Sequence, residues 1–85
     1  MKLKENFVLR QVADTWVVLP VGAATLDFNG MLTLNETGAF LWQALLSGKD
    51  PVEAILAEYD VSKELATADV EEFLTSLRTA GCLEE

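Results

Sequence analysis

Hydrophobic residues follow two different spacings along this chain, and the spacing changes near residue 35. Residues 1–34 are rich in Val, Leu, Thr and aromatic residues, which is typical of β-strands. Residues 35–85 carry apolar positions three and four residues apart, between good capping residues, which is typical of amphipathic helices. This order predicts an α+β domain in which an N-terminal sheet is followed by helices.

Three strands are expected in the first part of the chain. The first covers residues 7–12 and the second covers residues 15–21, with a short turn between them. Asn29-Gly30 is a strong hairpin signal, because both residues tolerate the positive φ of a type I′ turn. It introduces the last strand, residues 31–34, and completes a three-stranded antiparallel sheet.

Three helices are expected in the second part. Asn35 is a good N-cap for the first helix, and Gly48 is placed to end it in the left-handed conformation. Asp50 is the expected N-cap of the second helix. Ser62 can cap the third helix, which runs to about Ala80 and, at about 27 Å, is the longest element.

Gly38 lies inside the first expected helix, where a glycine costs about 1 kcal/mol relative to alanine. A close approach of another backbone would explain a glycine at this position. The last strand is the nearest candidate along the chain.

The sheet is expected to be apolar on both faces. Residues 16–21 are apolar without a break, and residues 31–34 are apolar except for Thr33. An antiparallel sheet with helices on one face usually has polar side chains on the other, so a second cover is expected here. Three covers fit: the chain's own N-terminal strand and loops, a second copy of the chain, or a partner peptide. Residues 25–28 form either a fourth short strand or an ordered loop, and whether residues 22–29 cover the strand edge is open.

Composition limits the class of protein. The 85 residues suffice for one domain, residues 1–85, with a small core. The longest stretch without charged or hydroxyl-bearing residues, Trp16 to Ala24, is far shorter than the roughly 20 residues of a membrane span. The first residues lack the apolar run of a secretory signal, and Cys82 is the single cysteine. We therefore expect a cytoplasmic protein that is not inserted in a membrane.

Charge argues against nucleic-acid binding. Six Lys or Arg and fourteen Asp or Glu give a formal net charge of −8. Three strands with three helices in this order suggest a winged-helix-like module, whose third helix commonly binds DNA. Here the third helix has two bases, Lys63 and Arg78, against four acids, so it would repel phosphates. The four acids are Glu64, Asp69, Glu71 and Glu72.

The chain offers little catalytic chemistry. It contains no histidine, which is the commonest general base and metal ligand. Its five glycines fit no phosphate-binding spacing, and its carboxylates form no calcium-loop pattern. We expect no catalytic residue, no metal site and no cofactor, and therefore no enzyme.

One segment carries a resemblance to a known family. It begins at Gly30, ends at Trp42 and has the sequence GMLTLNETGAFLW. Together with later spaced residues it looks like the PqqD family, which comprises pyrroloquinoline quinone synthesis protein D and related RiPP recognition elements. The later residues are Gly48, Asp69-Val70, Phe73-Leu74, Leu77 and Gly81-Cys82-Leu83. The resemblance spans residues 16–83 and is most specific in the Leu34–Gly38 turn.

The resemblance implies a non-catalytic peptide chaperone with a winged-helix-like fold. Members bind the leader segment of a ribosomally synthesised precursor peptide and present it to a modifying enzyme, often a radical S-adenosylmethionine protein. The leader is expected to add as an antiparallel strand to the edge of the third strand, beside the third helix. On this chain that implies a peptide-binding site at Met31, Leu32, Thr33 and Leu34. Residues 21–29 are longer than the tight turn expected of the family.

Five residues of the third helix are the candidate groove residues. Phe73 and Leu77 lie on its apolar stripe and are either core residues or the pocket floor. Asp69, Glu72 and Ser76 follow one side of the stripe, where they form either a groove rim or an ordinary solvated face. If they form the rim, the leader should carry a basic residue nearby.

A second class of function, different from peptide binding, also fits the sequence. The same apolar edge would suit a structural or regulatory interaction module that forms an obligate homodimer by pairing two edges. Catalysis is a distant third possibility.

Overall fold

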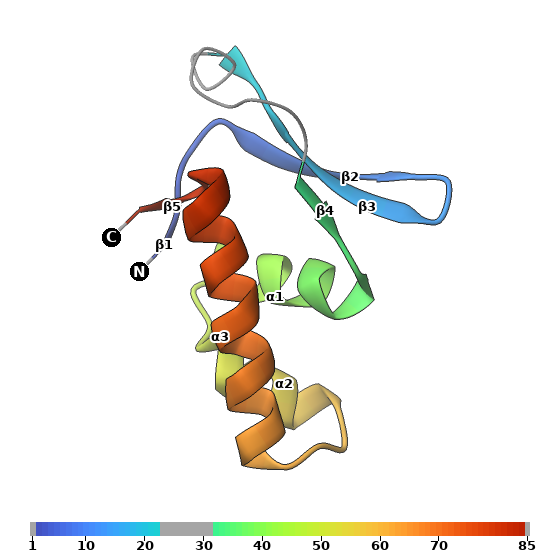
Figure 1. Cartoon of the computed structure of the whole chain (residues 1–85), viewed down its shortest axis with the longest axis vertical. Helices are drawn as coiled ribbons and strands as arrows, with labels where there is room; N and C mark the ends of the chain where they lie inside the picture. The colour runs from blue at the N-terminus through green and yellow to red at the C-terminus, as the bar shows by residue number, and fades with distance from the viewer. Residues whose placement is uncertain (1, 23–31, 85) are drawn as a thin grey trace.

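The computed structural model describes residues 2–22 and 32–84 of the chain. A three-stranded antiparallel sheet in the order β2-β3-β4 is followed by three helices (Figure 1), which confirms the predicted α+β fold. The strands of this sheet are β2 (Phe7–Val12), β3 (Thr15–Pro20) and β4 (Leu32–Leu34), and the helices are α1 (Glu36–Leu46), α2 (Pro51–Glu58) and α3 (Lys63–Ala80).

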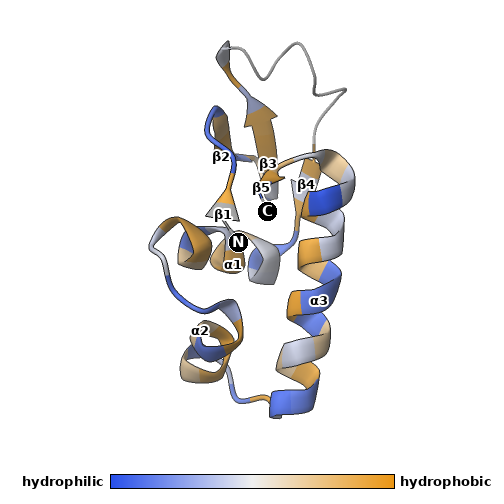
Figure 2. Ribbon diagram, turned by 90° about the vertical axis from the view of Figure 1, so that its left-hand side faces the viewer, coloured by the Kyte–Doolittle hydropathy of each residue, from blue (hydrophilic) through white to orange (hydrophobic). Residues whose placement is uncertain are grey.

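β3 is the central strand of this sheet. It pairs with β2 through a tight hairpin, in register from Val12↔Thr15 to Phe7↔Pro20, and with β4 from Trp16↔Leu34 to Val18↔Leu32. The hairpin extends past the helices (Figure 1), and β3 is hydrophobic along most of its length (Figure 2).

Burial on both faces explains why apolar and polar residues do not alternate along β3. Val18 faces the helices and is fully buried, and Val17, which points to the opposite face, is only 5% exposed. The expectation of a sheet covered on two sides therefore holds at the middle of β3. The hairpin signal at Asn29-Gly30, the possible strand at residues 25–28 and Met31 lie outside the described residues, as does most of the segment 22–29.

A second small sheet joins the two ends of the chain. β1 (Lys2–Leu3) pairs antiparallel with β5 (Leu83–Glu84), and the Lys4 N–H donates to the Cys82 carbonyl at 2.8 Å. The two strands lie beside the C-terminal end of α3 (Figure 1). The sequence pattern does not indicate this sheet, because two-residue strands are too short to show a period. Burial of Leu3 and Leu83 in the core stabilises it.

The helix ends follow from local capping chemistry. The side chains of Asn35, Asp50 and Ser62 each accept a hydrogen bond from a backbone N–H in the first turn, at 2.7, 2.9 and 3.1 Å. Gly48 and Gly81 have positive φ, of 75° and 81°, directly after α1 and α3. The predicted starts of all three helices and the predicted stops of α1 and α3 are confirmed.

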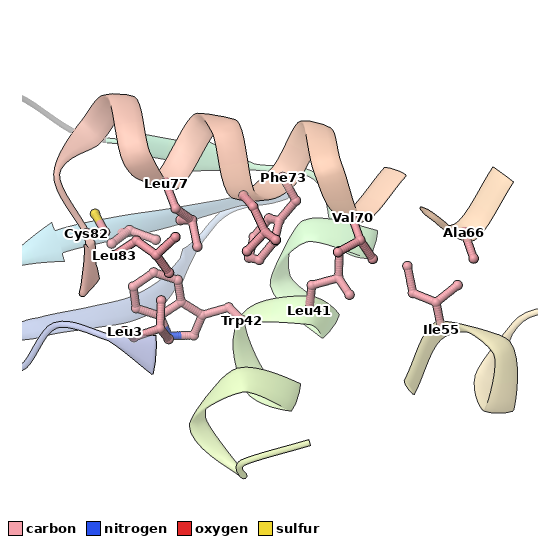
Figure 3. Packing of buried hydrophobic residues seen from close by; sticks show 12 residues of the cluster. Leu3, Leu41, Trp42, Ile55, Ala66, Val70, Phe73, Leu77, Cys82 and Leu83 are labelled. Carbon is pink, nitrogen blue, oxygen red and sulfur yellow. The ribbon is translucent and has the colours of Figure 1, made fainter. Parts of the chain in front are cut away.

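The core lies where α1 and α3 meet each other and the strands. Trp42 and Leu41 of α1 pack against Phe73 and Leu77 of α3, and Ile55 of α2 faces the N-terminal half of α3 (Figure 3). Trp42 is 1% exposed, which confirms its interpretation as a core residue. The buried cluster comprises Leu3, Val18, Leu41, Trp42, Ile55, Ala66, Val70, Phe73, Leu74, Leu77, Cys82 and Leu83. Among the residues that the structure describes, no helix has the length and hydropathy needed to cross a membrane.

The glycine in α1 permits a close approach between helix and strand. A Cβ at Gly38 would lie 3.2 Å from the Leu34 Cβ and 3.2 Å from the Asn35 Oδ1. Because Leu34 ends β4 and Asn35 caps α1, the first turn of the helix packs directly on the strand. The expected close contact with the last strand is confirmed.

Substitution of Gly38 by alanine should destabilise the protein, although alanine favours a helix. The added methyl group would push against Leu34 and the capping side chain of Asn35, both of which are held by the backbone. Overpacking of this kind costs roughly 1–3 kcal/mol, against about 0.5–1 kcal/mol gained in helix propensity. We expect urea denaturation to show a free energy of unfolding lower by about 1 kcal/mol. Thr75→Ala, at an exposed position of α3, is the control and should not lower stability.

Candidate functional site

A groove lies between β4 and α3, which are neighbours in Figure 2. It has a volume of about 280 Å³ and is called the β4–α3 groove below. One side comes from the end of β4 and the first turns of α1, and the other side comes from α3. The lining residues are Thr33, Leu34, Asn35, Thr37, Gly38, Leu41, Asp69, Glu72, Phe73 and Ser76.

The floor of the β4–α3 groove is formed by two buried apolar side chains. Leu41 is 1% exposed and Phe73 is 6% exposed, and both belong to the core cluster. Gly38, in the first turn of α1, also lines the groove. An apolar side chain that entered the groove would therefore contact preformed packing surfaces.

The wall formed by α3 is polar and acidic. Asp69, Glu72 and Ser76 follow one another at intervals of three and four residues, so they share one side of the helix. Asp69 and Ser76 are half-buried and Glu72 is exposed. The Ser76 hydroxyl donates to the Glu72 carbonyl at 3.2 Å, which holds this side chain against the helix. Among the described residues, no lysine or arginine lines the groove.

A strand edge borders the same groove. Within the described part of the chain β4 pairs only with β3, and Thr33 and Leu34 on β4 line the groove. An edge strand presents unpaired N–H and C=O groups that can accept another strand. The groove thus combines backbone hydrogen-bonding groups, an apolar floor and an acidic wall.

Six of the nine candidate peptide-binding residues lie together in this groove: Thr33, Leu34, Asp69, Glu72, Phe73 and Ser76. The remaining three are placed differently. Leu32 lies on β4 but packs partly against the core, and Leu77 is fully buried in the core and does not line the groove. Met31 lies outside the described residues.

Four lining residues are absent from the candidate set, namely Asn35, Thr37, Gly38 and Leu41. The signal that could have found them is the turn from Leu34 to Gly38, which carries the family resemblance. The sequence indicates only their local roles as cap and helix residues. Their position at the groove could not be predicted from it, because that position depends on where α3 lies.

A second, wider hollow of about 560 Å³ lies under the β2–β3 hairpin, beside α1 and α2. Three half-buried aromatic residues line it, Trp16, Phe40 and Tyr59, and the last two rings meet edge to face at 5.4 Å. Its strand residues come mainly from β2 and β3, which are already paired with each other there. β2 is the other edge strand of the sheet, but no described residue of α3 lines this hollow.

Two further groups bear on chemistry. No cluster of three or more metal-ligating side chains occurs in residues 2–22 and 32–84. Burial raises the pKa of the Cys82 thiol to about 11, although Lys4 opposes this shift. A thiol with a raised pKa is a poor nucleophile at neutral pH. The groove is therefore the feature with the clearest capacity to bind a ligand.

A family model described as Coenzyme PQQ synthesis protein D (PqqD) matches residues 15–83. The chain belongs to the PqqD family. The matched segment contains every residue that lines the β4–α3 groove. No curated protein matches the chain significantly.

Two solved structures share the fold of this PqqD family member over nearly its whole length. One is TbiB1 in complex with the TbiA(beta) leader peptide, with 30% sequence identity and a TM-score of 0.77. The similarity covers 99% of this chain and 95% of that one. The other is lasso peptide synthetase B1 complexed with the leader peptide, with 26% identity and a TM-score of 0.76 over 99% of this chain and 96% of that one.

The Cys82 thiol should react slowly with a disulfide reagent such as DTNB while the protein is folded. With a pKa of about 11, the thiolate is scarce at pH 8, and it should become about 100-fold more abundant by pH 10. The initial rate should rise with pH by less than that proportion, because the Cys82 side chain is 0% exposed and reacts only when the fold opens, and protein unfolded in guanidinium chloride should react rapidly at pH 8. Rapid labelling of the native protein at pH 8 would contradict this assignment.

Proposed function

We propose that this protein binds the leader segment of a ribosomally synthesised precursor peptide and presents it to a separate modifying enzyme. The peptide adds as an antiparallel strand to the free edge of β4 and lies in the β4–α3 groove. The observation that supports the proposal is that an edge of β4 with no partner strand among the described residues and an apolar floor border one groove. The leader-peptide complexes among the similar structures support it.

The energetics require both the edge and the floor. β4 has three residues, so an added strand gains about three or four backbone hydrogen bonds, each worth 0.5–1.5 kcal/mol net. That gain roughly cancels an association cost of 4 kcal/mol or more. Two or three apolar side chains over Leu41 and Phe73, each worth about 1.5–3 kcal/mol, would bring the affinity towards the micromolar range.

The proposed binding residues follow from this arrangement. Leu32, Thr33 and Leu34 contribute strand backbone, and Met31, which lies outside the described residues, completes the predicted set. Phe73 contributes to the floor, with Leu77 beneath it in the core. On α3, Asp69, Glu72 and Ser76 form the wall.

The partner enzyme is a second element of the proposal. Family resemblance favours a radical S-adenosylmethionine enzyme, whereas one similar structure is a lasso peptide synthetase component. We propose a precursor-maturing enzyme of either kind. The domain itself acts without a cofactor and without catalysis.

Titration of the whole protein with defined peptides tests this function. The probes are the TbiA(beta) leader peptide and peptides selected on the protein from a displayed library of random sequences. We expect micromolar heats of binding, and backbone amide shifts at residues 32–34 and along the groove side of α3. If no probe binds, or if the shifts map to the hairpin instead, the proposal is wrong.

A separate measurement of oligomeric state tests the homodimer alternative. Two copies could pair their β4 edges, which would bury the site that the peptide needs. Light scattering over a dilution series should show a monomer at micromolar concentration. A dimer that persists on dilution and ignores every peptide would favour the alternative.

Filling the groove should abolish binding without unfolding the protein. Ser76→Trp places an indole in the β4–α3 groove, and because Ser76 is only half-buried the core is left intact. We expect peptide affinity to fall at least about tenfold, since the indole occupies the space of an incoming side chain. Thr75→Trp, on the exposed side of the same helix, is the matched control and should bind normally. Equal affinities for the two variants would place the peptide elsewhere.

A further inference from the structure

We infer that the β4–α3 groove selects peptides in which a lysine or arginine pairs with Asp69 and Glu72, beside apolar residues that reach the floor. The inference rests on the proposed function and specifies the class of peptide that the groove accepts. It assigns selectivity to the α3 wall and affinity to the strand edge and the floor.

The two carboxylates are placed to share one basic group. Asp69 and Glu72 are three residues apart on α3, which separates them by about 4.5 Å along the helix axis. Both line the groove. A single guanidinium or ammonium group above this turn can therefore lie within hydrogen-bonding distance of both carboxylates.

The negative charge in the groove has no local compensation among the described residues. No lysine or arginine lines the groove there. The chain as a whole carries a net charge of −8. A peptide with a basic residue at this position would supply the missing charge and would also be attracted at long range.

A bound peptide would bury Asp69 and Glu72 further and so increase the free-energy cost of leaving their negative charges unpaired. Asp69 is already half-buried, and an added strand would remove more water from the wall. A carboxylate that loses water without gaining a partner destabilises the complex. Neutral and acidic peptides therefore bind with lower affinity than a basic peptide. This difference in affinity is the selectivity of the groove.

The charge also favours one placement of the peptide along the groove. Asp69 and Glu72 occupy the part of the wall nearer the N-terminus of α3, whereas Ser76, one turn further on, is neutral. A strand edge by itself accepts a peptide in several registers, because every residue offers the same backbone groups. A single basic side chain over the acidic turn would define one register.

Selection from a displayed library of random peptides gives the first measurement. Peptides that bind the wild-type protein should be enriched in Lys or Arg next to apolar residues. Peptides that bind the Asp69→Asn/Glu72→Gln double variant should lose the enrichment in basic residues and keep the apolar ones. The double variant should fold normally, because neither residue belongs to the core cluster.

Titration of one selected peptide gives the second measurement. The double variant should bind it about tenfold more weakly at low salt, and the difference should shrink as salt is added. The Glu64→Gln/Glu71→Gln double variant removes the same charge from exposed positions of α3 that do not line the groove. It should change the affinity less than about twofold.

Reversing the charge on both partners distinguishes a direct ion pair between the peptide and Glu72 from a general effect of the protein's net charge. A synthetic peptide whose basic residue is replaced by Glu should bind wild-type protein poorly and should regain affinity on a Glu72→Lys variant. Glu71→Lys, the matched control, should not restore it.

These measurements distinguish a failure of the inference from a failure of the proposed function. If peptides bind with amide shifts at β4 and α3, but show no basic preference and no restored affinity, the inference is wrong and the proposed function stands. If no selected peptide causes shifts at β4 and α3, the proposed function fails as well.

Discussion

The contact between Leu34 and Gly38 is the constraint on which the candidate site depends. Leu34 ends β4, Asn35 caps α1, and Gly38 lets the first turn of the helix approach the strand to within side-chain contact. Only one residue, Asn35, therefore separates β4 from the helix that carries Leu41. Since α1 also packs on α3 through the core, the positions of β4 and α3 are coupled, and the groove between them has a defined width.

An edge strand is normally a risk for aggregation, and at the edge of β4, which has no partner strand among the described residues, the structure limits the risk by two means. β4 is only three residues long, and α3 borders it with an acidic wall. A long or strongly acidic strand from another chain would gain little by pairing there. A short segment with apolar side chains would gain both backbone hydrogen bonds and contacts with the floor, which suits the edge to a transient peptide partner.

Different elements supply the separate contributions to binding in this arrangement. In the proposed complex the strand edge would provide sequence-independent hydrogen bonds, Leu41 and Phe73 would provide apolar contact, and Asp69 with Glu72 would provide charge. Phe73 and the two carboxylates lie on adjacent sides of α3, so the helix stripe that stabilises the core also positions the wall. Affinity and selectivity could therefore change independently, because substitutions on the exposed side of α3 leave the packing of the core unaltered.

Local sequence alone determined the helix starts, the strand at residues 7–12, the order of elements and the family resemblance. Caps, turns and periodicity are encoded within one or two turns of chain, as Asn35, Ser62 and Gly81 illustrate. Only the tertiary structure decided that Phe73 lines the groove whereas Leu77, one turn further on, is fully buried. It also decided the pairing of Leu3 with Leu83 and the place of Gly38 and Leu41 in the groove. The reason is that exposure on a helix stripe and the pairing of very short strands depend on contacts between residues far apart in sequence, which no local pattern records.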